Sequence, residues 1–365
     1  MRLLLLCTDA YGGHGGIALF NREFVAALVA QPWCDEVVVV PRVIPHREAI
    51  DVPPKVTFID AAANGAFAYM RAIRRVRREP FDLVICGHVN LLPVAAAIAR
   101  DPLLITHGIE AWRHLKKPFS ERLLHRCRGI VSVSALTRDR VLAWSGYRGP
   151  TFVLPNAVRL ECYGMRPKNE TLVARYRLAG KRVLLTVGRI VSQERYKGFD
   201  EVIEVLPDLP SDVVYLIAGG GNDTPRLRAK THDLGVADRV VFTGLFPEEE
   251  KPDLYNLADV YVMPSRGEGF GFVFLEAMAS GVPVIASKHD GGREALRDGS
   301  LGWLVDPASP DELRAAIVEV LTHGSRRIPE GLQHFTIENF RSRVSAILRR
   351  LVAEPSESVE QRSRA

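Results

Sequence analysis

Short apolar runs alternate with amphipathic stretches along the first part of the chain. The runs have the length of buried strands, which in parallel sheets are apolar on both faces. They lie at Leu3–Thr8, Val37–Val40, Val56–Ile59, Leu83–Cys86, Leu103–Thr106, Ile130–Val133 and Phe152–Leu154. Helical periodicity separates most of them, at Ile17–Ala30, Ala66–Arg78, Leu91–Arg100 and Ala135–Trp144. This alternation predicts an α/β fold with a mostly parallel, doubly wound sheet.

The alternation is interrupted between Pro155 and Gly180 and then begins again. Six further strands are predicted, at Arg182–Val187, Val213–Ile217, Val240–Phe242, Val260–Met263, Val284–Ala286 and Gly302–Val305. Two Rossmann-like domains joined near residues 155–180 are the natural interpretation. A last helical pattern covers Phe335–Val352. We therefore expect one domain over residues 1–160, a second over 161–330, a C-terminal helix over 331–353 that packs back toward the first domain, and a disordered tail over 354–365.

The composition is that of a soluble globular protein, with 365 residues, 47% of them hydrophobic and 25% charged. Since domains hold roughly 100–200 residues, this length favours two domains, with ligands expected in the cleft between them. The apolar start is too short for a signal peptide, and no run approaches the ~20 residues that cross a bilayer. Five cysteines without a CxxC pair predict neither disulfides nor a zinc site. The cytoplasm is the expected location.

The charge is distributed unevenly along the chain. Residues 1–150 hold 20 Lys and Arg against 13 Asp and Glu, a balance of 20 − 13 = +7. Residues 151–365 hold 28 against 30, a balance of 28 − 30 = −2. This asymmetry is compatible with an anionic partner for the first half and equally with an ordinary solvated face. No basic motif with interleaved aromatic residues is present, so no nucleic acid is expected as a partner.

A glycine-rich loop, Tyr11–Gly16, follows the first predicted strand and precedes a helical pattern. Glycines let the backbone approach a ligand closely, and a helix N-terminus offers free N–H groups to an anion. The spacing is not GxGxxG and no Walker lysine follows. An anion site and a tight turn without a ligand both remain open at this stage.

Two cations and two carboxylates lie near strand ends in the second half. Arg189 closes a predicted strand and suits bidentate contact with a phosphate, while Lys197 precedes a helix as a point charge. Glu268 lies in a glycine-rich loop after another strand, and Glu276 lies in the first turns of the helix that opens near Phe272. Carboxylates can hold polyol hydroxyls while the helix end holds phosphate. Each residue alone could equally be a surface charge or compensate a helix dipole.

Taken together, these motifs resemble glycosyltransferase family 4, the retaining sugar-nucleotide transferases of GT-B fold. The most specific is the E-x7-E pair Glu268 and Glu276 in EGFGFVFLEAMASGVPVIAS. The other motifs occur in the family's order: GGHGG, His107-Gly108, VSVSALT, PNAV, VGRI with a downstream KG, AGGG and VFTG. The resemblance extends from about residue 1 to residue 322. It implies two Rossmann-like, doubly wound parallel-sheet domains that face a central cleft.

The resemblance also implies the reaction. The donor would be a nucleotide diphosphate sugar, UDP- or GDP-linked, and a hexose would pass to a glycan or lipid-linked acceptor in cell-surface polysaccharide or lipopolysaccharide synthesis. The first domain would hold the acceptor and the second the nucleotide sugar. The chain has no Asp-x-Asp motif, which favours metal-free chemistry with no cofactor. A GT-B sugar-nucleotide epimerase and a non-enzymatic nucleotide-sugar-binding protein remain alternatives.

Residue roles follow from the resemblance alone. It gives Glu276 the ribose hydroxyls, Glu268 the transferred sugar, and Arg189 and Lys197 the diphosphate. The segment between these two cations is longer than in many members, so Arg195 is an alternative to Lys197. The resemblance makes His107 catalytic together with Glu268, with His107 beside the sugar near the reacting carbon. Gly15 and Gly16 would approach the diphosphate from the first domain, and the backbone N–H groups of Phe270, Gly271 and Phe272 would complete the donor site. Acceptor contacts or purely structural roles are both open for His14, His88, Asn90 and Glu110.

The predicted helix Ala66–Arg78 is rich in arginine. We expect Phe67, Met70 and Ile73 to form an apolar stripe that packs on the sheet, with the arginines on the opposite side. The basic residues of this helix and of the same domain are Arg71, Arg74, Arg75, Arg77, Arg78, Arg113, Lys116, Lys117, Arg122 and Arg126. Such a face would attract anionic lipid headgroups at the inner side of a membrane, or would merely keep the helix soluble.

Overall fold

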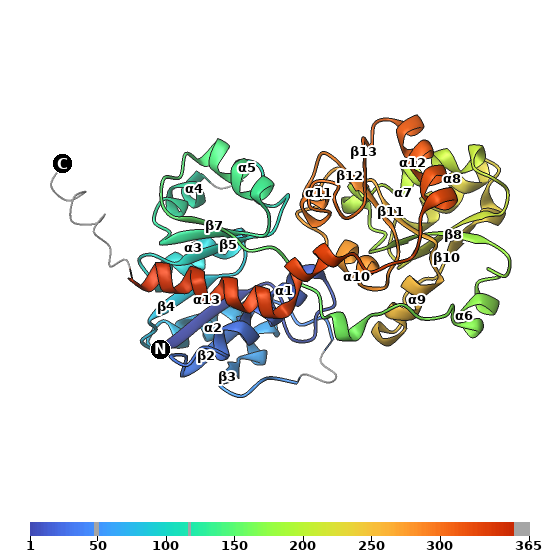
Figure 1. Cartoon of the computed structure of the whole chain (residues 1–365). Coiled ribbons are helices and arrows are strands. Elements are labelled where there is room, and N and C mark those ends of the chain that lie inside the picture. Colours follow the sequence, from blue (N-terminus) through green and yellow to red (C-terminus); the bar gives the residue numbers. More distant parts are fainter. Residues whose placement is uncertain (47–50, 116–117, 354–365) are drawn as a thin grey trace. The chain divides into compact units, whose positions relative to one another are not determined.

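The computed structural model describes residues 1–46, 51–115 and 118–353 and divides the chain into two compact units (Figure 1). Unit 1 comprises Met1–Asn156 together with the C-terminal segment that begins at Ile337. Unit 2 comprises Ala157–Thr336. The chain therefore enters unit 2 slightly before residue 160 and leaves it at the start of the last helix. The tail predicted over 354–365 lies outside the described residues.

Unit 1 is built on a seven-stranded parallel sheet in the order β3-β2-β1-β4-β5-β6-β7. Its strands are β1 (Arg2–Cys7), β2 (Glu36–Pro41), β3 (Val56–Phe58), β4 (Leu83–Cys86), β5 (Leu103–Thr106), β6 (Gly129–Ser132) and β7 (Thr151–Val153). Each predicted strand of this half is confirmed, with ends that shift by one residue at most. The prediction succeeds because strands buried on both faces appear as continuous apolar runs.

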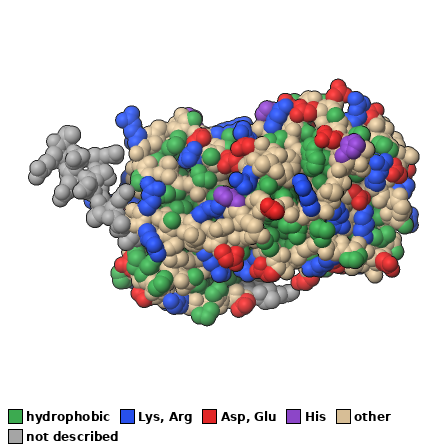
Figure 2. Space-filling model, in the orientation of Figure 1, with side chains coloured by type: hydrophobic (Ala, Val, Ile, Leu, Met, Phe, Trp, Pro, Cys, Tyr) green, Lys and Arg blue, Asp and Glu red, His purple; other side chains and the backbone are tan. Residues whose placement is uncertain are grey.

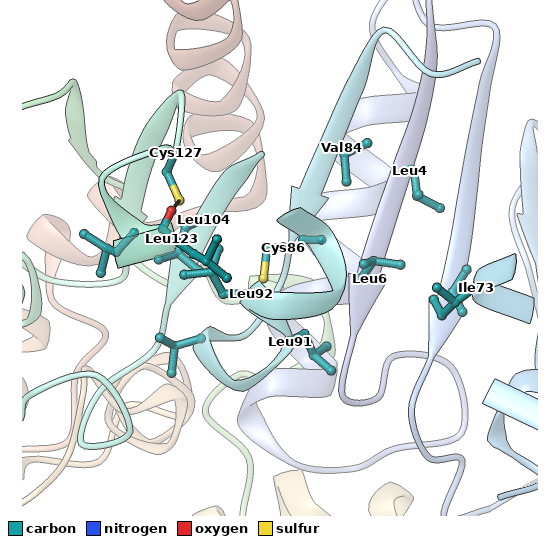
Figure 3. Packing of buried hydrophobic residues seen from close by; sticks show 14 of the residues in the cluster. Leu4, Leu6, Ile73, Val84, Cys86, Leu91, Leu92, Leu104, Leu123 and Cys127 are labelled. Carbon is teal, nitrogen blue, oxygen red and sulfur yellow. Dashed lines mark hydrogen bonds between the residues drawn. The ribbon is translucent and has the colours of Figure 1, made fainter. Parts of the chain in front are cut away.

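Helices cover the sheet of unit 1: α1 (Gly16–Val29), α2 (Ala66–Val76), α3 (Leu92–Ile98), α4 (Pro118–Leu124), α5 (Ala135–Ser145) and α13 (Ile337–Ala353). Figure 3 shows part of the core, where Ile73 of α2 lies beside Leu4 and Leu6 of β1. The C-terminal helix α13 packs on α1, with the Phe340 ring 5.7 Å from that of Phe20. The last helix of the chain thus completes the first unit.

The apolar stripe predicted for α2 is wrong for two of its three residues, since only Ile73 is buried. Phe67 is 82% exposed and Met70 is 47% exposed. The buried face is instead formed by Tyr69, Ala72, Ile73 and Val76. These positions follow the i, i+3, i+4, i+7 spacing of a helix face, and this face packs on the sheet. Phe67 and Met70 therefore share the solvent side of α2 with its arginines.

Unit 2 contains a six-stranded parallel sheet in the order β10-β9-β8-β11-β12-β13. Its strands are β8 (Arg182–Val187), β9 (Val213–Ala218), β10 (Val240–Phe242), β11 (Val260–Met263), β12 (Val284–Ser287) and β13 (Trp303–Val305). Its helices are α6 (Glu170–Arg175), α7 (Phe199–Val205), α8 (Thr224–Asp233), α9 (Lys251–Leu257), α10 (Phe272–Ala279), α11 (Gly292–Ala295) and α12 (Pro310–His323). Each of the six predicted strands is confirmed here too.

Both sheets are doubly wound around a central strand, as predicted. β1 lies between β2 and β4 in unit 1, and β8 lies between β9 and β11 in unit 2. In such sheets the loops beyond the carboxyl ends of neighbouring strands meet at one edge, and ligands bind there. On the face in view in Figure 2, Lys and Arg side chains are interspersed with acidic and apolar ones. In the part of the chain that is described, no helix is long and apolar enough to cross a bilayer.

Candidate active site

The two predicted cations of unit 2 come together beyond the carboxyl end of β8. Arg189 follows that strand directly, and Lys197 ends a short 3-10 turn, Ser192–Lys197. A Cβ atom on Gly188 would lie only 3.1 Å from the Lys197 Nζ atom, so the ammonium sits against the backbone where β8 ends. Glu194 joins the two: its carboxylate accepts a hydrogen bond from the Arg189 guanidinium and lies 3.0 Å from the Lys197 Nζ atom.

Arg195, the alternative to Lys197, is engaged elsewhere. Its guanidinium donates two hydrogen bonds, of 3.1 and 2.8 Å, to the carboxylate of Asp223. Asp223 also accepts hydrogen bonds from Arg226, which in turn binds Asp200. This network ties the turn to α7 and α8. The geometry therefore favours Lys197 over Arg195 as the partner of Arg189.

Glu268 lies in the loop after β11, the strand that neighbours β8. Burial raises the pKa of its carboxyl group, whereas the Lys197 ammonium and the backbone N–H groups of Phe270 and Gly269 lower it. The Glu194 carboxylate, also close by, raises it further. The structure thus brings Glu268 close to Lys197 and to Glu194. In this arrangement the Phe270 N–H group, predicted to contact the donor, faces the Glu268 carboxylate.

The start of α10 requires glycine. Gly271 precedes the helix with a φ of +89°, and a Cβ atom there would lie 2.5 Å from the Phe274 ring. The side chains of Phe270 and Phe272 are buried, so only their backbone can contact a ligand. The first N–H groups of a helix have no partner within it and favour an anion. The helix thus begins where the sequence predicts it, near Phe272, and its N-terminus is the place where we expect an anion to bind.

Asp290, which the sequence analysis missed, fixes the loop that carries Glu268. Its fully buried carboxylate accepts hydrogen bonds from the Ser265 hydroxyl (2.6 Å), the Glu268 N–H (2.9 Å) and the Gly292 N–H (3.0 Å). Asp290 thereby joins the loops that follow two adjacent strands, β11 and β12. The sequence signal was an Asp-Gly-Gly triplet shortly after a predicted strand, at the edge where ligands bind.

We expect this carboxylate to make the loop sensitive to pH. Burial raises the pKa of Asp290 to about 7, although the hydrogen bonds that it accepts lower it. A proton on Asp290 would remove the negative charge that strengthens these three hydrogen bonds, and so would weaken the attachment of the loop. We therefore expect turnover to fall as the pH drops below about 7. Because the folded state binds this proton more tightly than the unfolded chain, its contribution to stability falls as the pH rises from about 4 to about 7.

Two variants test this origin of the acid limb in a pH–rate profile. Ser265→Ala removes one donor to the carboxylate, so the limb should move to higher pH. Asp290→Asn places an amide NH2 against an N–H donor, so turnover should be low at every pH and the limb should be lost. A wild-type rate that stays constant between about pH 5.5 and 8 would contradict the assignment.

Glu276 is buried in α10 with both carboxylate oxygens hydrogen-bonded. Lys251 Nζ donates to its Oε1 atom and the Tyr255 hydroxyl to its Oε2 atom, each at 2.7 Å. Burial lowers the pKa of Lys251, but the carboxylates of Glu276 and Glu248 raise it more. The Glu276 carboxylate also raises the pKa of the Tyr163 hydroxyl, with which it shares a hydrogen bond. One acceptor position of Glu276 is therefore left for a ligand hydroxyl. Lys251 and Tyr255 were also missed; their spacing of four places them on one face of α9.

In unit 1, His107 and Glu110 lie together beyond the carboxyl end of β5. His107 Nε2 lies 2.9 Å from the Gly87 carbonyl oxygen, which can only accept, so Nε2 carries the proton. The Glu110 carboxylate accepts a hydrogen bond from the His107 backbone N–H at 2.6 Å. Burial lowers the pKa of His107, which favours the neutral ring with Nδ1 unprotonated. This ring can therefore accept a hydrogen bond from a hydroxyl group.

His88 follows β4, the strand that neighbours β5, and its ring centroid lies 6.4 Å from that of His107. Its Nδ1 atom accepts a hydrogen bond from the backbone N–H of Asn90 at 3.1 Å, which caps a short 3-10 turn. Burial lowers the pKa of His88. These contacts support the structural role that the sequence left open for His88. The Asn90 side chain is exposed.

The glycine-rich loop after β1 places its predicted residues at the start of α1. Gly15 is the N-terminal cap and Gly16 the first helical residue, and both are exposed. A Cβ atom on Gly15 would meet nothing within 4 Å, so the fold itself does not require glycine there. The His14 ring lies 4.7 Å from the ring of His46 rather than beside His107.

Comparisons with known proteins identify the family of this chain. A family model described as Glycosyltransferase Family 4 matches residues 14–161, and one described as Glycosyl transferases group 1 matches residues 169–335. The chain is 30% identical to the GDP-mannose-dependent alpha-(1-6)-phosphatidylinositol monomannoside mannosyltransferase of Mycobacterium tuberculosis, over 90% of this chain and 91% of that protein. It is 31% identical to the phosphatidyl-myo-inositol mannosyltransferase of Mycobacterium leprae, over 88% and 87%.

Solved structures share the fold. Anabaena HepE in complex with UDP and glucose aligns with a TM-score of 0.76 and 22% identity, covering 95% of this chain and 99% of HepE. The sucrose-phosphate synthase of Thermosynechococcus elongatus aligns with a TM-score of 0.73 and 21% identity, covering 95% and 94%. Fold and relatives together define a nucleotide-sugar-dependent glycosyltransferase with the GT-B fold. The chain belongs to glycosyltransferase family 4.

Proposed function

We propose that this enzyme is a retaining mannosyltransferase that uses GDP-mannose and acts on a lipid-linked acceptor. The observation that carries the proposal is that Lys197 interacts with Glu268, in the loop before α10, and shares the Glu194 carboxylate with Arg189. Cations and a helix end suit a diphosphate, and a carboxylate suits sugar hydroxyls. The choice of mannose, of GDP and of a lipid acceptor rests on the printed activities of the two mycobacterial relatives.

In the proposed reaction the bond between the anomeric carbon and the diphosphate oxygen breaks. The acceptor hydroxyl oxygen forms a bond to the same carbon on the same face, and its proton passes to the departing diphosphate. Negative charge then grows on the diphosphate while the sugar gains oxocarbenium character. Arg189, Lys197 and the α10 N-terminus would stabilise that growing charge without having to reorganise. Glu268 would accept hydrogen bonds from the transferred sugar, and Glu276 from the ribose.

Three residues of unit 1 also have proposed roles in binding the donor. His107, neutral and with Nε2–H committed to a carbonyl, would accept a sugar hydroxyl at Nδ1. Gly15 and Gly16 would let the start of α1 approach the diphosphate. Both glycines are exposed, which such an approach requires.

A panel of nucleotides tests the donor assignment. We expect GDP and GDP-mannose to raise the Tm more than UDP, ADP or UDP-glucose do. A ligand at 100 times its Kd should stabilise the fold by about 2.7 kcal/mol, which is a readily measured shift. A larger response to UDP-glucose than to GDP-mannose would overturn the assignment of the donor.

We expect full activity in the presence of excess EDTA. The reason is that Arg189, Lys197 and the helix end supply the positive charge that a divalent ion supplies in other transferases. Modest stimulation by magnesium through faster product release would be compatible with this. Complete loss of transfer in EDTA, with recovery on addition of a divalent ion, would contradict it.

We also propose that α2 contacts an anionic membrane surface. Its exposed side combines the apolar side chains of Phe67 and Met70 with arginines. Arg113, Arg122 and Arg126 of the same unit are exposed as well, whereas Lys116 and Lys117 lie outside the described residues. Arginines attract anionic headgroups, and a neighbouring aromatic side chain can enter the interface. A lipid-linked acceptor would be reached from that surface.

Vesicle sedimentation tests this contact. The wild-type protein should bind vesicles that contain phosphatidylglycerol and not pure phosphatidylcholine, and salt should weaken binding. The triple change Arg74→Glu, Arg75→Glu and Arg78→Glu should weaken it at least about a hundredfold. As a matched control, Phe67→Ser should weaken binding but preserve its salt dependence. Equal binding to both kinds of vesicle would contradict the proposal.

A further inference from the structure

The cation pair of unit 2 already has a counter-ion from the same chain. The Glu194 carboxylate accepts a hydrogen bond from the Arg189 guanidinium through Oε1, and its Oε2 atom lies 3.0 Å from the Lys197 Nζ atom. The side chains of Glu194 and Lys197 are only 15% and 14% exposed, whereas that of Arg189 is 70% exposed. A single partly buried carboxylate therefore bridges both groups that would hold the diphosphate.

The backbone around Glu194 holds it in this place. The residue has φ −118° and ψ 29°, outside the helical region, in the turn that connects the two cations. On one side, the Ser192 N–H donates to the Asn222 side-chain oxygen at 3.0 Å. On the other side, Arg195 is bound to Asp223. Both ends of the turn are thus anchored to the loop after β9, and the Glu194 side chain points to the cations between these anchors.

The four groups Arg189, Lys197, Glu194 and Glu268 carry no net charge between them, since two cations face two carboxylates. The negative charge of Glu194 raises the pKa of Glu268, so the two carboxylates are close enough to interact. A diphosphate that approached this set would meet as many negative as positive groups. It could gain both cations only if one carboxylate moved away. Glu194 is the one whose two oxygens occupy them.

We propose that Glu194 is a resident counter-ion, which holds Arg189 and Lys197 until the donor's diphosphate displaces it and returns to them as the nucleotide diphosphate leaves. The inference rests on the proposed function for the identity of the displacing group. Its consequence is that Glu194 weakens binding of donor and product alike. Glu194 also keeps the two cations paired when no ligand is bound, and its return to them speeds release of the nucleotide diphosphate.

Calorimetric titration with GDP and with inorganic pyrophosphate tests the displacement. Glu194→Gln keeps the shape of the side chain and removes its charge. We expect it to bind both ligands about tenfold more tightly than the wild type, which corresponds to about 1.4 kcal/mol. The inhibition constant of GDP should fall by a similar factor. Asp233→Asn, which removes one exposed negative charge from α8, should leave both affinities unchanged.

An equal or weaker affinity of Glu194→Gln for pyrophosphate would overturn the counter-ion role. Should the variant fold poorly, Glu194→Ala provides the same comparison, and the rise in Tm caused by a saturating concentration of GDP should exceed that of the wild type. Tighter pyrophosphate binding without any mannose transfer by the wild type would retain the counter-ion and refute the proposed function. Mannose transfer by the wild type, without tighter pyrophosphate binding by Glu194→Gln, would support the proposed function and refute the counter-ion role.

Discussion

Replacing Lys197 with methionine is expected to lower kcat by about 10²–10³-fold, the typical cost of removing one preorganised group that stabilises charge in the transition state. Lys197 Nζ lies against the end of β8 and interacts with Glu268. Because its charge faces the position proposed for the leaving diphosphate, the loss should fall mainly on turnover. The measurement is the initial rate of mannose transfer at saturating GDP-mannose.

Arg195→Met is the matched control, since it removes a cation from the same turn. Arg195 is held by Asp223, so its loss should lower the Tm and leave kcat within a few-fold of the wild type. A retained rate in Lys197→Met, together with a large loss of rate in Arg195→Met, would instead assign the diphosphate to Arg195.

Glu276→Gln and Glu268→Gln are expected to fail in different ways. Losing a hydrogen bond to a charged group costs about 1.5–3 kcal/mol, which is roughly ten- to over a hundredfold. Glu276→Gln should weaken binding of GDP and of GDP-mannose alike, since its carboxylate is assigned to the ribose. Glu268→Gln should bind free GDP normally and lose turnover, since it is assigned to the sugar. Titration with GDP and rate measurements separate the two.

Folding must be checked for Glu276→Gln, because Lys251 is largely buried and loses a carboxylate partner. Circular dichroism and the Tm provide that check. Tyr255→Phe is a milder control: it removes one hydrogen bond to Glu276 and keeps the charge, so GDP affinity should fall by less. Equal GDP affinity in the wild type and a folded Glu276→Gln would remove the ribose assignment.

The sheets could be predicted from the sequence because each strand is a local apolar run, buried on both faces. The side of α2 that packs on the sheet could not be predicted in this way. Its short sequence carries apolar residues on two sides, and packing on the sheet buries Tyr69 and Ile73 while it leaves Phe67 in solvent. A short helix therefore gives a less certain pattern than a buried strand does.

The candidate site was predictable to a similar degree. Motif residues at strand ends, such as Lys197 and Glu268, do lie together, because neighbouring parallel strands bring their following loops to one edge. The residues that hold them were missed. Asp290 binds a loop that is distant in sequence, and Glu194 acts through a pairing that no local pattern encodes. Such pairings are defined only once the sheet order brings the loops together.

The central claim is tested most directly by following radiolabelled mannose from GDP-mannose into lipid. The purified enzyme would be incubated with vesicles that contain phosphatidylinositol and its monomannoside, and the label would be counted in the extracted lipid. We expect labelled lipid with the wild type, a rate lower by about 10²–10³-fold with Lys197→Met, and retention of the α configuration in the product. Absence of label in the lipid, with no effect of GDP on the Tm, would contradict the claim.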